Sequence, residues 1–128
     1  MTDKRRILII DDEQDIVILF KQVLEESGFA VLCAPDGTVG LDMAASNAVD
    51  LILLDVHMPG ISGLSVLRKL RENERTKSVP VIFLTGSPMD VDQIVEAIDL
   101  NPSDFVTKSI SAKELIARIQ WAFRKQSL

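Results

Sequence analysis

The sequence predicts one α/β domain in which five strand–helix units build a single parallel sheet. Two observations carry this prediction: short runs that are apolar at every position, and intervening segments whose apolar residues recur at helical spacing. A run without polar residues suits a strand that is covered on both faces, as the strands of parallel sheets are. The five predicted strands are ILII (7–10), AVLCA (30–34), LILL (51–54), VIFL (81–84) and FV (105–106).

The segments between these runs carry helix signals in alternation with the strands. Such alternation with short connections requires parallel strands joined by right-handed crossovers. The first helical stripe consists of Ile16, Leu19, Phe20, Val23 and Leu24, and the third of Leu64, Val66, Leu67 and Leu70. The boundary signals are Ser27-Gly28 after the first helix, Asn101-Pro102 after the fourth, Pro80 before the fourth strand, and the capping pair Ser111 and Glu114 at the last helix.

Composition bounds the size and the class of the protein. With 128 residues, 47% of them hydrophobic, the chain suits one globular domain over residues 1–128. A net charge of −5 argues against non-specific electrostatic binding of nucleic acid and is compatible with a cation site. The single cysteine, Cys33, excludes an intramolecular disulfide and is interpreted as a buried structural thiol. No apolar stretch approaches the ~18 residues of a membrane span, so we expect a cytoplasmic protein.

Polar residues follow the predicted strands at the sheet edge where open parallel sheets bind ligands. Asp11 and Asp12 come after the first strand, Asp55 after the third, Thr85 after the fourth and Lys108 after the fifth. Carboxylates gathered at one edge repel each other unless a cation intervenes, and hard oxygen ligands favour Mg²⁺. An aspartate nucleophile, a metal, a hydroxyl and a lysine together indicate phosphoryl transfer to a carboxylate.

Several of these residues also have ordinary structural interpretations. An aspartate after a strand commonly caps the next helix, which is the alternative for Asp11 and Asp12. Glu13 is interpreted as a solvated residue that complements the helix dipole. Capping does not explain Asp55, because the next helix is predicted to begin near Ser62. Lys108 and Thr85 could each be an ordinary surface or turn residue, so their assignment to the site depends on their occurrence together with the three aspartates.

The motifs ILIIDDE, LLDVHMPGISG, PVIFLTG and SDFVTKS, in this order, resemble those of bacterial two-component response-regulator receiver domains of the chemotaxis-Y-like type. The resemblance covers nearly the whole chain. It implies a doubly wound, flavodoxin-like (βα)5 fold with the strand order 2-1-3-4-5. It also implies that Asp55 takes a phosphoryl group from a sensor histidine kinase or a phosphotransfer protein. The chain would catalyse only its own phosphorylation and dephosphorylation, and would not be an enzyme with a separate substrate.

The same resemblance implies a magnesium site. Asp12 and Asp55 would bind Mg²⁺ directly, together with the backbone carbonyl of His57 in the loop that follows. Asp11 would act on the metal through water.

The resemblance further implies how the phosphoryl group is held and sensed. Thr85 and Lys108 would contact the phosphoryl oxygens. Phe105 stands where the family keeps a switch aromatic, although plain core packing explains an aromatic residue there equally well. The surface of the fourth helix, fifth strand and fifth helix would signal to a downstream effector protein or effector domain, without direct nucleic-acid binding.

Three positions depart from the family pattern. Ser109 follows the lysine where proline is usual, Asn101-Pro102 replaces Gly-Ala, and Gly86 replaces alanine. A cis peptide bond to serine costs roughly 2.5–4 kcal/mol, which leaves a different path open for the loop that holds Lys108. Because the lysine stem is flexible, we still expect its ammonium to lie near Asp55.

Two other functions are alternatives to a receiver domain that is phosphorylated on Asp55. Ser109 motivates a receiver-like interaction module that does not depend on phosphorylation. A small Mg²⁺-dependent phosphatase with an aspartyl nucleophile is disfavoured, because such an enzyme has a second acid two residues after the nucleophile, where His57 stands.

Charges near the end of the chain bear on self-association. Receivers similar in this region use charges such as Asp104 and Arg118 to pair across a two-fold axis. The fourth helix lacks a basic partner, since it offers Met89, Asp90, Asp92 and Gln93. We therefore expect a monomer or a weak homodimer.

Overall fold

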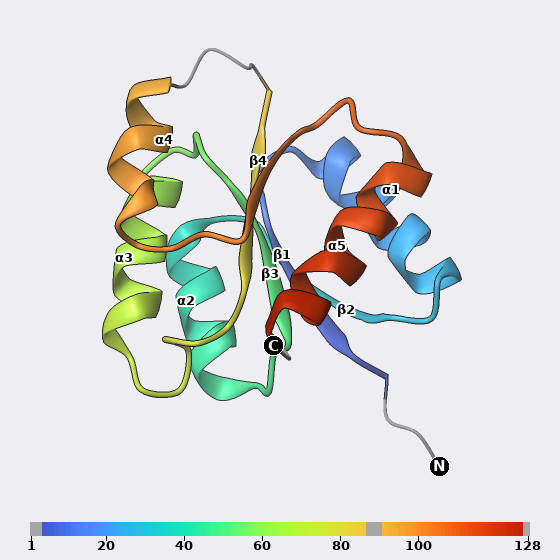
Figure 1. Ribbon diagram of the computed structural model, residues 1–128, viewed down its shortest axis with the longest axis horizontal. Helices are drawn as coiled ribbons and strands as arrows, with labels where there is room; N and C mark the ends of the chain where they lie inside the picture. The colour runs from blue at the N-terminus through green and yellow to red at the C-terminus, as the bar shows by residue number, and fades with distance from the viewer. Residues whose placement is uncertain (1–3, 87–90, 127–128) are drawn as a thin grey trace.

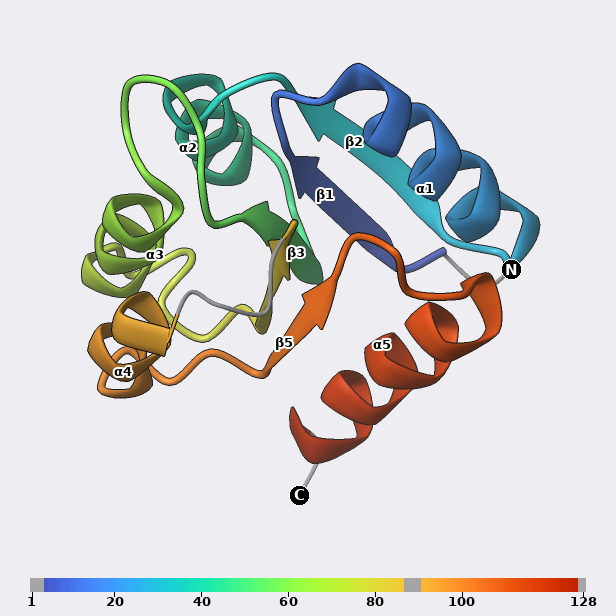
Figure 2. The ribbon, with the colours of Figure 1, turned by 90° about the horizontal axis from the view of Figure 1, so that it is seen from above.

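A computed structural model describes residues 4–86 and 91–126 of the chain. The elements are β1 (Arg6–Ile10), α1 (Gln14–Glu26), β2 (Ala30–Ala34), α2 (Gly37–Ser46), β3 (Leu51–Asp55), α3 (Gly63–Glu72), β4 (Val81–Thr85), α4 (Val91–Ile98), β5 (Asp104–Thr107) and α5 (Ala112–Gln126). The strands form one parallel sheet in the order β2-β1-β3-β4-β5. Helices α1 and α5 cover one face of it, and α2, α3 and α4 cover the other (Figures 1 and 2). The predicted fold class and strand order are confirmed.

The three central strands are buried on both faces, as their apolar runs predicted. Successive side chains of a strand point to opposite faces, so each run contributes to two hydrophobic clusters. One cluster contains Ile7 and Ile9 and packs under α1 and α5, and the other contains Leu8 and Ile10 and packs under α2 and α3. A polar residue at any of these positions would lie in one core or the other. This double burial explains why the run is apolar throughout.

The outer strands differ from the prediction. In β2, residues 30–33 are only partly buried, and in β5 only Val106 is fully buried. Both strands lie at an edge of the sheet, where each has a neighbouring strand on one side alone. Full coverage was therefore predicted wrongly for these two strands, because an apolar run does not reveal its place in the sheet.

The predicted helix boundaries are confirmed where the structure describes them. Ser62 is the N-cap of α3, and its hydroxyl accepts a hydrogen bond from the Ser65 N–H at 3.2 Å. Ser111 accepts one from the Glu114 N–H at 3.1 Å, which is one half of the predicted capping box. Asn101, after α4, has a φ of 56°, the left-handed conformation that its side chain tolerates.

The stripe predicted for the first helix holds in part. Phe20 and Leu24 are buried in the core, but Leu19 is 52% exposed and the adjacent Ile18 is 64% exposed. Helical spacing predicts that Leu19 lies beside the buried face of the helix, but it does not predict whether neighbouring elements cover this side chain. No helix in the described part of the chain is long and apolar enough to cross a membrane.

Cys33 packs against the cluster under α1 and α5, where it is half-buried. Burial raises the pKa of its thiol, the nearby Lys21 opposes this rise and Glu25 adds to it. A raised pKa lowers the fraction of reactive thiolate. Its surroundings therefore agree with the interpretation of a structural thiol.

Candidate phosphoacceptor site

The carboxyl ends of β1, β3, β4 and β5 bring the predicted site residues to one edge of the sheet, the side seen in Figure 2. Asp11 directly follows β1, and Lys108 directly follows β5. Asp55 and Thr85 are the last residues of β3 and β4, one position earlier relative to the strand ends than predicted. The structure thus brings together residues up to 97 positions apart in the chain, as the Lys108–Asp11 pair illustrates.

Asp55 is held in place by the chain on both sides of it. Its side chain is nearly inaccessible, because the whole residue is 2% exposed. The His57 N–H donates a hydrogen bond to Asp55 Oδ1 at 3.3 Å, so the loop after β3 folds back over the carboxylate. This contact places the His57 backbone beside Asp55, while its role as a metal ligand stays a prediction.

Gly63 is a site residue that the sequence reasoning missed. The first turn of α3 lies so close to β3 that a Cβ at position 63 would collide with the Asp55 carbonyl oxygen. The Gly63 N–H also donates a hydrogen bond to the Val56 carbonyl at 3.0 Å. A glycine at the start of the helix that was predicted to begin near Ser62 was the available signal, because glycine allows close approach of two backbones.

Three carboxylates form a compact group that could hold a cation. One oxygen each of Asp11, Asp12 and Asp55 lies within 4.8 Å of the others. Asp11 and Asp55 are buried and Asp12 is exposed. Asp11 Oδ2 and Asp55 Oδ2 have no hydrogen-bond partner among the described residues. Buried anionic oxygens without partners are costly, so this group fits a hard divalent cation with oxygen ligands.

Lys108 lies between these carboxylates and keeps the place that we expected for it. Its Nζ is 3.1 Å from Asp11 Oδ2 and 3.2 Å from Asp55 Oδ2. Both contacts are ion pairs, and the ammonium donates its hydrogen bond to the other oxygen of Asp11, Oδ1, at 3.2 Å. The Lys108 N–H donates to the Thr85 carbonyl at 2.8 Å, which anchors its backbone beside β4. The described residues contain no cis peptide bond, so Ser109 is accommodated in trans.

Glu13 makes a contact that the sequence interpretation did not include. Its side chain is 59% exposed, as expected for a solvated residue at the start of a helix, but its Oε1 also lies 2.5 Å from Lys108 Nζ. Its backbone is the N-cap of α1, but its side chain makes no capping hydrogen bond. A long carboxylate side chain can interact either with the helix dipole or with a distant cation, and here the cation is Lys108, which follows β5 and is remote in sequence.

Electrostatics at the site are dominated by burial of negative charge. Burial, and next the charge of Asp11, raise the pKa of Asp55 to about 7, although the charge and hydrogen bonding of Lys108 oppose this. Burial alone would lower the pKa of Lys108, but hydrogen bonds to Glu13 and Asp11 and the charge of Asp55 outweigh burial and raise it. The ammonium is therefore firmly protonated, and it lies beside a carboxylate whose charged form is disfavoured by burial.

Thr85 and Phe105 lie on neighbouring strands beside the carboxylates. Thr85 is buried and pairs in register with Thr107 on β5. The ring of Phe105 stacks on Phe83 of β4, with ring centroids 5.3 Å apart, and it is partly buried against the core. This packing agrees with the structural alternative for Phe105, and its role in switching stays a prediction.

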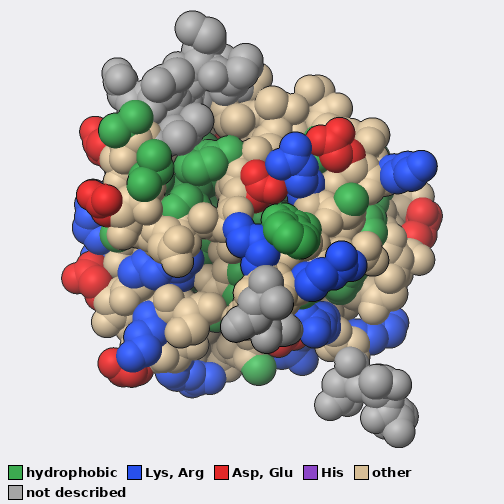
Figure 3. Space-filling model, viewed as in Figure 1, with side chains coloured by type: hydrophobic (Ala, Val, Ile, Leu, Met, Phe, Trp, Pro, Cys, Tyr) green, Lys and Arg blue, Asp and Glu red, His purple; other side chains and the backbone are tan. Residues whose placement is uncertain are grey.

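The face formed by α4, β5 and α5 mixes charged and hydrophobic side chains (Figure 3). Asp104 and Arg118 pair within the chain, with Arg118 Nη1 2.9 Å from Asp104 Oδ2. The charges considered for a two-fold contact thus satisfy each other here. Of the helix residues in that argument, Met89 and Asp90 lie outside the described residues, as do the side chains of Asp92 and Gln93.

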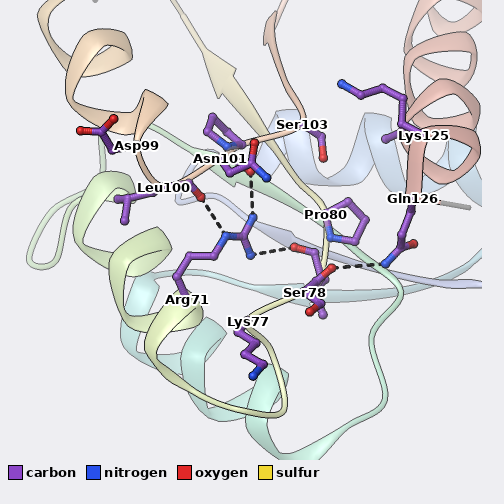
Figure 4. Close-up of a pocket in the computed structure, with 13 residues that line it drawn as sticks. Arg71, Lys77, Ser78, Pro80, Asp99, Leu100, Asn101, Ser103, Lys125 and Gln126 are labelled. Atoms are coloured by element: carbon purple, nitrogen blue, oxygen red, sulfur yellow. Dashed lines mark hydrogen bonds between the residues drawn. The ribbon is translucent and has the colours of Figure 1, made fainter. Parts of the chain in front are cut away.

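A hollow lies at the opposite edge of the sheet, away from the three grouped carboxylates. It has a volume of about 490 Å³ and lies between the end of α3, the start of β4, the loop after α4 and the end of α5 (Figure 4). Arg71 projects into it from α3 and donates to the carbonyls of Leu100 at 2.9 Å, Val79 at 2.9 Å and Asn101 at 3.3 Å. These contacts join α3 to the segments before β4 and after α4, and the described residues form no group of three carboxylates here.

The fold and the site together define a receiver domain, and comparisons with known proteins agree. A model of the response regulator receiver domain matches residues 7–120. The chain therefore belongs to the response regulator receiver family of two-component signal transduction.

Particular relatives are longer proteins that the chain matches over part of their length. It is 42% identical over 123 residues to a protein of Bacillus subtilis named uncharacterized transcriptional regulatory protein YkoG, covering 96% of this chain and 53% of that protein. It is 37% identical over 120 residues to the transcriptional regulatory protein CpxR of Escherichia coli, covering 94% and 50%. The chain spans about half the length of the curated relatives it matches. A receiver domain structure from Clostridium thermocellum is 32% identical, with a TM-score of 0.86 over 96% of this chain and 97% of that one.

Proposed function

We propose that Asp55 accepts a phosphoryl group from a phosphohistidine of a sensor kinase or a phosphotransfer protein. The observation that carries this proposal is the buried Asp55 carboxylate, whose Oδ2 lacks a hydrogen-bond partner among the described residues yet lies 3.2 Å from Lys108 Nζ. In the reaction an Asp55 oxygen attacks phosphorus, a P–O bond forms, and the P–N bond to histidine breaks. The bond electrons leave with the imidazole, which is a good leaving group once it is protonated.

Asp11, Asp12, Asp55 and the His57 carbonyl are the groups that would hold Mg²⁺. The bound cation would offset the negative charge of the carboxylates and of the incoming phosphoryl oxygens. The position of Asp55 at the end of β3 and the hydrogen bond from the His57 N–H to its Oδ1 support this proposal.

Lys108 and Thr85 would stabilise the phosphoryl group before and after transfer. The Lys108 ammonium already lies at the edge of the carboxylate group, and the Lys108 backbone hydrogen bond to Thr85 keeps the two residues adjacent. A preorganised cation and hydroxyl favour the charge that develops on the phosphoryl oxygens. Hydrolysis of the acyl phosphate then resets Asp55, so the chain's own phosphorylation and dephosphorylation are the only reactions in this proposal.

Signal output in this proposal uses the face of α4, β5 and α5. A shift of Thr85 toward the phosphoryl group would let Phe105 change its packing, and the altered surface would be read by an effector protein or an effector domain. Such a receiver works in the cytoplasm as a monomer or weak homodimer. The alternative of a phosphorylation-independent module lost its main support, because Ser109 does not displace Lys108 from Asp55.

Intact-mass spectrometry after incubation with acetyl phosphate and Mg²⁺ tests the assignment of Asp55. Wild-type protein should gain one phosphoryl group, and Asp55→Asn should gain none. Asp42→Asn, a change of an exposed aspartate on α2, is the matched control and should be labelled like the wild type. Equal labelling of the wild type and Asp55→Asn would rule out Asp55 as the acceptor.

A further inference from the structure

Lys108 contacts three carboxylates, and the nearest belongs to a residue outside the predicted metal and phosphoryl groups. The Nζ atom lies 2.5 Å from Glu13 Oε1, but 3.1 Å from Asp11 and 3.2 Å from Asp55. The lysine side chain is 9% exposed and that of Glu13 is 59% exposed. Glu13 therefore contacts the ammonium from the solvent side of the site, while the two aspartates contact it from the buried side.

We propose that Glu13 is a positioning residue that restrains Lys108 and competes with the phosphoryl group for its ammonium. This inference rests on the proposed function, in which Lys108 stabilises the phosphoryl group on Asp55. It adds a residue that weakens this stabilisation and so shortens the life of the phosphorylated state.

The backbone of Glu13 limits how far its side chain can follow the lysine. Glu13 is the N-cap of α1, and its N–H donates to Asp11 Oδ1 at 2.8 Å. A phosphoryl group on Asp55 would need a hydrogen bond from Lys108 of about 2.7–2.9 Å, the usual length when both partners are charged. The ammonium that would make this bond is the same one that Glu13 Oε1 contacts at 2.5 Å, so a stronger interaction with one of the two groups weakens its interaction with the other.

Mg²⁺ would strengthen this competition. Partial neutralisation of Asp11 and Asp55 by the cation would lower their attraction for the ammonium, and Glu13, which is not among the grouped carboxylates, would keep its full charge. Glu13 would then be the main restraint on Lys108 when the phosphoryl group arrives.

Titration calorimetry with beryllofluoride in excess Mg²⁺ tests this inference, because beryllofluoride mimics a phosphoryl group on aspartate. Glu13→Gln keeps a carbonyl acceptor but removes the charge, and it should bind beryllofluoride about three- to fivefold more tightly than the wild type, as expected for loss of one partly exposed ion pair. Glu13→Asp keeps the charge on a shorter stem and should lie between the two. Asp15→Asn removes an exposed charge in the first turn of α1 and is the matched control, with an affinity close to that of the wild type.

A double-mutant cycle separates restraint of Lys108 from a general charge effect. In a Lys108→Met background, Glu13→Gln should no longer tighten binding, because its effect passes through the lysine. Unchanged affinity of Glu13→Gln, or an equal gain in the Lys108→Met background, would overturn the inference while leaving the proposed function intact. A wild-type protein that does not bind beryllofluoride would overturn the proposed function and this inference together.

Discussion

The two edges of the sheet differ in how far the hydrogen-bonding groups of their charged side chains are satisfied. At the amino edge, the Arg71 guanidinium donates to three backbone carbonyls of the loops around it (Figure 4). At the carboxyl edge, Asp11 and Asp55 are buried with oxygens that lack hydrogen-bond partners among the described residues. Satisfied polar groups stabilise a fold and unsatisfied ones cost free energy. The comparison indicates that the amino edge contributes stability and that the carboxyl edge gives up stability for binding.

The largest expected effect concerns Lys108 at the carboxyl edge. Lys108→Ala should slow phosphorylation by acetyl phosphate about 100-fold, because it removes a preorganised charge from the phosphoryl position. Ser109→Pro should react at nearly the wild-type rate, since it mainly reshapes the loop that leads to Ser111. Phosphorylation rates from mass spectra measure both. An unchanged rate and structural response in Lys108→Ala would revive the phosphorylation-independent module.

The proposed magnesium site at the carboxyl edge gives the next prediction. Asp12→Ala should weaken Mg²⁺ binding by about tenfold or more, and Asp11→Ala should weaken it less, because a direct ligand contributes more than one acting through water. Calorimetric titration of Mg²⁺ gives both affinities. Equal losses would show that the buried Asp11 and the exposed Asp12 share the metal in the same way.

At the amino edge the expected effect is on stability alone. Arg71→Met keeps much of the apolar stem but leaves carbonyls of Val79 and Leu100 without their donor, and it should lower the free energy of unfolding by about 2 kcal/mol. Denaturant unfolding measures this loss. Arg68→Met, on the exposed side of α3, is the control and should have little effect. A phosphorylation rate for Arg71→Met far below that of the wild type would contradict the inference that the amino edge affects stability alone.

The last expected effect is the dependence of stability on pH without metal, which follows from the burial of Asp55 beside Asp11. The pKa of Asp55 is raised to about 7 by burial and by Asp11. Between its ordinary pKa near 3.8 and this value, the folded protein binds a proton that the unfolded chain has released. Stability should therefore fall as pH rises through this window and then level off.

Unfolding in a chelator at several pH values measures this dependence. Asp55→Asn cannot lose that proton, so its stability relative to the wild type should increase from pH 5 to pH 7.5. A constant difference over this range would mean that Asp55 is ionised throughout.

The sequence by itself determined the fold class and most of the site. Apolar runs separated by helical stripes are local patterns, and the polar residues that end them must meet because the carboxyl ends of parallel strands share an edge. Asp11, Asp55, Thr85 and Lys108 could therefore be predicted to converge. The caps Ser62 and Ser111 could also be predicted, because each bonds to a residue three positions later.

Only the tertiary structure decided which contacts form between distant elements. Glu13 looked like a solvated helix residue until β5 brought Lys108 to within 2.5 Å of it. The close approach of α3 to the backbone of Asp55 explains why position 63 is a glycine, and the carbonyls that Arg71 binds include one in a loop about 30 positions away. Side chains of this kind have several possible partners within reach, and the packing of remote elements, which no local pattern encodes, selects one of them.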